Sequence, residues 1–132
     1  KGNYKGKGFV VDAETREILW SGLSQPHSPR ILPDGVKCVC DSQAQRLLVD
    51  RGGEVKAVNF PNKYPRGLSY GKDHLYVGLS QTRQVDMLKP EEATSGLAVV
   101  NRTSLAVEQI VPLPVVEIYD VLSLSTVSAG NT

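Results

Sequence analysis

Three stretches of the sequence share one pattern and decide the fold: Gly8–Trp20 (GFVVDAETREILW), Arg46–Val58 (RLLVDRGGEVKAV) and Gly96–Glu108 (GLAVVNRTSLAVE). In each stretch a run of apolar residues ends in Val-Asp or Val-Asn, a short polar turn follows, and alternating apolar residues resume. This pattern predicts a β-hairpin. An Asp or Asn side chain that opens such a turn accepts hydrogen bonds from the backbone just beyond it. We therefore predict structural roles for Asp12, Asp50 and Asn101.

Further strands are predicted between these hairpins, as two pairs joined by tight glycine-containing turns. The hairpin pattern recurs after roughly forty and then roughly fifty residues, which is typical of a propeller blade with four strands. The longer interval contains a polar insertion at 84–94. The predicted pairs are 29–33 with 36–40 and 66–70 with 74–78, and a last inner strand is predicted at 117–124.

The fold class predicted is all-β, with β-propeller blades of four antiparallel strands and about three blades in a single partial domain, residues 1–132. Three blades are too few to close a ring, since propellers have about four to eight. The first hairpin lacks its two inner strands, and the last inner strand lacks its hairpin. We therefore predict a partner, either a second copy that completes a six-bladed homodimer with twofold symmetry or another chain. The alternative is that the chain is the carboxyl half of a longer propeller.

Several short motifs, in this order and spacing, resemble an uncharacterised bacterial family of conserved hypothetical proteins, a domain of unknown function expected to form β-propellers. The motifs are PHSPR (26–30), CDS (40–42), PRGL (65–68), VGLS (77–80) and EIYDV (117–121). Members of that family are typically more than twice as long, which implies that this chain corresponds to a carboxyl-terminal half. The resemblance implies no activity. The chain departs from the family pattern in a shorter segment after Arg83 and in Gln43, where a glycine is expected.

Composition argues against several partners. Fifteen basic and fourteen acidic residues leave a formal charge of +1, too balanced for a nucleic-acid-binding face. No apolar stretch approaches the ~18 residues of a membrane span, and we expect no leader peptide. Cys38 and Cys40 would share one strand face as buried thiols, which favours a reducing, cytoplasmic compartment. His27 and His74 are isolated, so neither a metal site nor a cofactor is predicted.

The candidate ligand-binding residues are polar side chains on the predicted inner strands, where a dry core would not tolerate an unpaired charge. One interpretation is a pocket in which arginines bind a carboxylate, phosphate or sulfate and carboxylates accept hydrogen bonds from hydroxyls. The other is that ion pairs of the Arg30–Glu117 type join neighbouring blades. The set is His27, Arg30, Arg66, Glu117, Tyr119 and Asp120.

No catalytic constellation is predicted. Ser42 and Ser80 lack the setting of a nucleophile elbow and are expected to bond to nearby loops, and Trp20 is expected to pack between blades. The sequence favours a non-catalytic module that binds a small polar or anionic ligand or a partner protein. The alternatives are a metal-dependent hydrolase of sugars or lactones, which needs a cage of oxygen ligands, and a purely structural assembly element.

Overall fold

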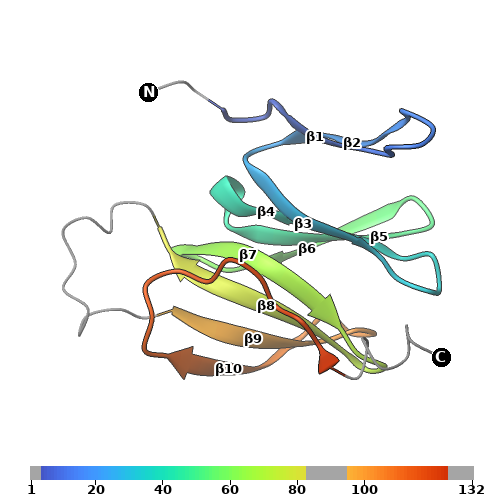
Figure 1. The fold of residues 1–132 in the computed structure, drawn as a ribbon. Helices are drawn as coiled ribbons and strands as arrows, with labels where there is room; N and C mark the ends of the chain where they lie inside the picture. Colours follow the sequence, from blue (N-terminus) through green and yellow to red (C-terminus); the bar gives the residue numbers. More distant parts are fainter. Residues whose placement is uncertain (1–3, 83–94, 125–132) are drawn as a thin grey trace.

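The computed structural model describes residues 4–82 and 95–124, which form three antiparallel sheets. Figure 1 shows the sheets in chain order, with the first hairpin at the top. The first sheet pairs β1 (Gly8–Val11) with β2 (Ile18–Leu23). The second contains β3 (Pro26–Ile31), β4 (Lys37–Asp41), β5 (Arg46–Arg51) and β6 (Glu54–Asn59). The third contains β7 (Lys63–Tyr70), β8 (His74–Gln81), β9 (Ser95–Asn101) and β10 (Val107–Leu113). A short 3₁₀ turn, η1 (Ser42–Ala44), links β4 to β5.

The hairpin turns are closed by the side chains that the sequence singled out. In the first turn, Asp12 Oδ1 accepts hydrogen bonds from the backbone of Glu14 (2.8 Å) and Thr15 (2.9 Å). These two bonds hold the pKa of Asp12 below its ordinary value, and the bond from Thr15 has the larger effect. Equivalent bonds run to Asp50 from Gly53 and to Asn101 from Thr103 and Ser104. The structural role predicted for these turn residues is confirmed.

Each four-stranded sheet is a simple meander in which every strand pairs with the next one in the chain. The predicted inner strands are present but longer, since β3 begins at Pro26, β7 at Lys63, and β8 continues to Gln81. β3 and β7 carry the same irregularity. His27 and Arg30 of β3 lie opposite Cys40 and Cys38, and the matching pairs in the third sheet are Pro65 with Leu79 and Leu68 with Val77. The extra residue on the inner strand is a β-bulge.

The main core lies between the two four-stranded sheets. Buried aliphatic side chains from both sheets meet there, and each fully buried leucine or valine contributes about 1.5–3 kcal/mol. A smaller cluster joins the first hairpin to the second sheet, where Val10 and Trp20 pack against Leu23, Val39 and Leu48. The packing role predicted for Trp20, between successive sheets, is confirmed. The main core contains Leu32, Cys38, Cys40, Leu47, Val49, Val58, Phe60, Leu68, Leu75, Val77, Leu79, Ala98 and Val100.

The two cysteines belong to this core as free thiols. Both point to the same face of β4, as predicted from their spacing. Burial raises the pKa of each thiol to about 12. Because the thiolate is the reactive form, Cys38 and Cys40 act here as packing residues.

The prediction of a β-strand at residues 117–124 is wrong. Residues 114–124 instead follow β7 and β8 without a backbone ladder of their own. The segment is held mainly by serine side chains: Ser80 Oγ accepts from the Ile118 N–H (2.8 Å), and Ser69 Oγ accepts from the Ser123 N–H (2.9 Å). A strand needs a neighbour whose backbone continues the ladder, and no described strand lies on its open side.

The polar insertion predicted at 84–94 lies outside the described residues. Across the part of the chain that is described, no helix combines the length and the apolar character needed to cross a lipid bilayer.

Candidate functional site

The six predicted ligand-binding residues come from three segments that lie next to each other. His27 and Arg30 are on β3, and Arg66 is on β7. β3 and β7 are neighbours across the interface between the two four-stranded sheets (Figure 1). Residues 114–124, which contain Glu117, Tyr119 and Asp120, run along the other side of β7. We call the surface made by these six residues the inner-strand site.

Arg30 reaches past β7 to an acidic residue of the last segment. Its Nη2 atom lies 3.2 Å from Asp120 Oδ1, and its Nη1 atom donates to the Pro29 carbonyl at 3.0 Å. The Arg30 and Asp120 side chains are 34% and 67% exposed. An ion pair in such an exposed setting contributes about 0–1 kcal/mol, so an incoming anion can replace the carboxylate at little cost. The sequence anticipated an arginine–carboxylate pair here, but its acidic member is Asp120.

Arg66 lies over the exposed ring of Tyr119. Its Cζ atom is 4.4 Å from the ring centroid, a cation–π distance. The Tyr119 hydroxyl donates to Glu117 Oε2 at 2.9 Å. Among the described residues, Arg66 has no hydrogen bond and no ion pair through its guanidinium group. That group therefore keeps its donors for another partner.

His27 is positioned by its neighbours in the fold. The buried Ser42 hydroxyl donates to the Pro65 carbonyl at 2.5 Å, so the contact at 2.9 Å between His27 Nδ1 and Ser42 Oγ has the histidine as donor. The His27 ring also meets the Tyr64 ring edge-on, with centroids 5.6 Å apart. Because Ser42 is fully buried and its proton is committed, the pair is not a nucleophile with its base.

A family model described as a domain of unknown function (DUF4915) matches residues 1–132. The chain belongs to the DUF4915 family. This confirms the expected membership of a family catalogued as a domain of unknown function. No significant match was found among curated proteins or among solved structures. The side chains of this DUF4915 domain are therefore the basis for distinguishing between functions.

The two arginines of the inner-strand site are not at equivalent places in the DUF4915 sheets. The bulge register aligns Arg30 with the buried Leu68, and Arg66 with Ser28 inside the bulge. The bulge re-aims the inner strand. The arginines thus approach the site from different positions, one beside Asp120 and one over Tyr119.

Ser42 and Ser80 were predicted to bond to nearby loops, but in the DUF4915 domain they bond to segments far along the chain. Ser42 donates to Pro65 O (2.5 Å), and Ser80 donates to Ile118 O (3.1 Å). The sequence did not identify Arg51 and Arg102 as important. A signal was present, since each follows the Asp or Asn that opens a hairpin turn, Asp50 or Asn101.

The described part of the DUF4915 domain contains no group of three or more His, Cys, Asp or Glu residues placed to hold a metal ion. His74 bonds instead to Glu108, with Nε2 2.9 Å from Oε2. Hydrogen bonds from Asn101, and next from His74, hold the pKa of Glu108 below its ordinary value. This pair supports a hairpin end rather than a cage of metal ligands.

Proposed function

We propose that this chain is a non-catalytic β-propeller module whose inner-strand site binds a small ligand with an anionic group and hydroxyl groups. The observation on which this depends is the Arg66 guanidinium, stacked on Tyr119 and without a hydrogen-bond partner among the described residues. A guanidinium with free donors beside an exposed ring suits a carboxylate, sulfate or phosphate.

The charges of the site favour a ligand that is both anionic and hydroxylated. Arg30 and Arg66 supply donors, while Glu117 and Asp120 supply acceptors for hydroxyl groups. A purely anionic ligand would meet two carboxylates, and a purely neutral one would leave the Arg66 donors unused. A hydroxylated carboxylate of the sugar-acid type satisfies both.

The propeller arrangement is supported by serine hydrogen bonds that join each sheet to the next inner segment. Gly67 N–H donates to Ser28 Oγ at 3.0 Å, and Ser123 N–H donates to Ser69 Oγ at 2.9 Å. Ser42 and Ser80 donate to the carbonyls of Pro65 and Ile118. These bonds are of the same kind but not at register-equivalent places, since the bulge aligns Ser28 with Arg66 rather than with Ser69. Residues 116–124 thus stand beside β7 as β7 stands beside β3, which is how inner strands succeed one another around a propeller axis.

The ligand proposal is tested by titrating the protein with gluconate, acetate and glycerol, followed by amide chemical shifts. Gluconate is expected to bind more tightly than acetate or glycerol, because only gluconate offers both kinds of group. Arg66→Ala is expected to weaken gluconate binding by about tenfold or more, the effect of losing a charge-assisted hydrogen bond.

Arg16→Ala is the matched control, since Arg16 is an exposed arginine at the turn of the first hairpin. It is expected to leave gluconate binding unchanged. Gluconate binding that Arg66→Ala and Arg16→Ala affect equally would reject the inner-strand site.

We also propose that a second chain covers the two open ends of the array, making a six-bladed ring from two copies. Apolar side chains are exposed at both ends: Phe9 and Ile18 on the first hairpin, and Leu122 and Leu124 on the last segment. Such surfaces are uncommon on a free monomer. Within the described residues, β1 pairs with β2 alone, so its other edge is open to another strand.

Light scattering on a size-exclusion column tests the ring. The expected mass is twice that of one chain, and Leu122→Glu is expected to shift the particle toward a single chain by placing a charge in the interface. A wild-type protein that remains monomeric at high concentration would overturn the ring of two copies. The gluconate titration is independent of this outcome.

A further inference from the structure

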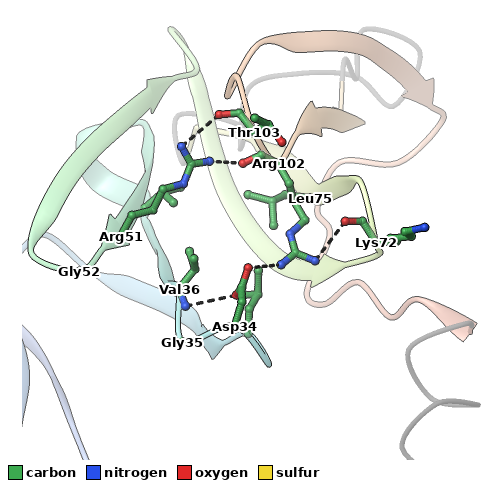
Figure 2. A pocket seen from close by; sticks show the side chains of 11 residues that line it. Asp34, Gly35, Val36, Arg51, Gly52, Lys72, Leu75, Arg102 and Thr103 are labelled. Carbon is green, nitrogen blue, oxygen red and sulfur yellow. Dashed lines mark hydrogen bonds and ion pairs between the residues drawn. The ribbon is translucent and has the colours of Figure 1, made fainter.

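A hollow lies between the two four-stranded sheets, at the end where their hairpin turns gather. It has a volume of about 630 Å³ and is lined by residues of four turns. Figure 2 shows Arg51 on one side of this hollow and Arg102 with Asp34 on the other. We call it the turn groove. It shares no lining residue with the inner-strand site.

Arg102 is held in place in the turn groove by an ion pair and two hydrogen bonds. Its Nη2 atom lies 2.8 Å from Asp34 Oδ2, and its Nη1 atom donates to the carbonyls of Gly71 (2.7 Å) and Lys72 (3.3 Å). The Arg102 side chain is only 18% exposed. The Asp34 carboxylate, the one acidic group of the lining, is thereby engaged by Arg102.

Arg51 is bound differently. Its guanidinium donates to the carbonyls of Arg102 and Thr103, the latter at 3.0 Å. Carbonyl groups orient the guanidinium but do not neutralise it, and among the described residues Arg51 has no carboxylate partner. Lys72 adds a second cation at the rim, on a side chain that extends away from Arg102 in Figure 2. Three cations and one carboxylate leave an excess of two positive charges.

We propose that the turn groove binds a phosphate group of a small organic phosphomonoester. The polar side chains of the lining that remain available to a ligand are mainly hydrogen-bond donors: Arg51, Lys72 and the Thr103 hydroxyl. The one carboxylate of the lining, that of Asp34, is already paired with Arg102. A phosphate dianion brings only acceptors and two negative charges, so it complements both the donors and the excess charge.

The volume of the groove and its apolar wall indicate that the phosphate carries an organic group. A hollow of about 630 Å³ is far larger than a phosphate ion and lies within the usual range for small-molecule pockets. Apolar side chains of both sheets, including Val36, Val49 and Leu75, form part of its wall. An apolar or planar group attached to the phosphate would lie against them.

The test is a titration with phenyl phosphate, inorganic phosphate and benzyl alcohol at constant ionic strength, followed by amide chemical shifts. Phenyl phosphate is expected to shift the amides of Gly35, Gly52 and Thr103, and to bind at least several-fold more tightly than either other probe. Shifts confined to other surfaces would overturn the proposal. Equal affinities for phenyl phosphate and inorganic phosphate would overturn the organic part of it.

Variants distinguish binding in this groove from a general effect of losing an arginine. Arg51→Gln is expected to weaken the phenyl phosphate binding reported by the Gly35, Gly52 and Thr103 amides about tenfold, whereas Arg16→Ala, at an exposed arginine in the turn of the first hairpin, is expected to leave it unchanged. Should Arg51→Gln fail to fold, Lys72→Ala removes an exposed cation without disturbing the turns and is expected to weaken binding about threefold. If both variants fold and neither changes the affinity for phenyl phosphate, the proposal is overturned. If only Lys72→Ala folds, an unchanged affinity in that variant overturns it.

Discussion

Gly67→Ala is expected to lower the free energy of unfolding by clearly more than Gly35→Ala, although the two glycines have nearly identical backbone angles. Gly67 has φ +84° and Gly35 has φ +85°. An alanine at either position adopts the left-handed conformation at a cost of about 1–2 kcal/mol. The two positions differ in what surrounds the added methyl group. At Gly35 nothing lies within 4 Å of it.

At Gly67 the added Cβ would lie 2.8 Å from the Cα and carbonyl carbon of Asp120 and 2.9 Å from the Val121 nitrogen. These are backbone atoms and cannot rotate away, so residues 116–124 must move off β7. Overpacking of this kind costs a further 1–3 kcal/mol or so. We therefore expect a total loss of about 2–5 kcal/mol at Gly67, measured by urea unfolding, against about 1–2 kcal/mol at Gly35.

The same substitution has a functional consequence, because Glu117, Tyr119 and Asp120 belong to the displaced segment. Gluconate binding should be lost in Gly67→Ala and retained in Gly35→Ala. Equal stability losses in the two variants would contradict the close packing of residues 116–124 on β7, and with it the inner-strand site.

A second large loss of stability is expected from Asp41→Ala. The Asp41 side chain is 1% exposed, accepts a hydrogen bond from the Ser24 N–H at 2.6 Å, and pairs with Arg46 Nε at 2.9 Å. Removing the carboxylate leaves the buried Ser24 N–H without an acceptor and Arg46 without its partner. We expect a loss of about 2–4 kcal/mol, because Arg46 is partly exposed and recovers some hydration.

Asp120→Ala is the matched comparison for Asp41→Ala. It also removes the acidic member of an arginine–aspartate pair, but this carboxylate is 67% exposed. Its loss is expected to cost less than about 1 kcal/mol. Unfolding curves in urea measure both variants, and similar losses would show that burial does not set the strength of these pairs.

Much of the strand pattern was predictable because its causes are local. A turn side chain such as Asp12 bonds to the backbone two and three residues ahead, so the short stretch around it contains both partners. The continuous apolar runs Cys38–Cys40 in β4 and Leu47–Val49 in β5 likewise indicate strands that are buried on both faces. The same reasoning located Cys38 and Cys40 in the core.

For the inner-strand site, the sequence predicted which residues belong to it but not which of them contact each other. The repeat places these residues on inner segments, but it does not show which arginine pairs with which carboxylate. Arg30 meets Asp120 across 90 residues of chain, a contact that depends on how sheets stack and on the close approach that Gly67 permits. The bulge that separates Arg30 from Arg66 in register is marked in the sequence of β7 by Gly67, but β3 has no matching glycine.

By itself the sequence determined the all-β class, the three hairpins, their turns and the burial of the central strands, because hydrogen bonds and runs of apolar side chains over a few residues specify them. Only the tertiary structure decided that residues 117–124 follow β7 without forming a strand, that Asp120 is the partner of Arg30, and that Arg51 and Arg102 border a common groove. Each of these depends on packing between segments far apart in the chain, where backbone approach and the available hydrogen-bond partners determine the outcome.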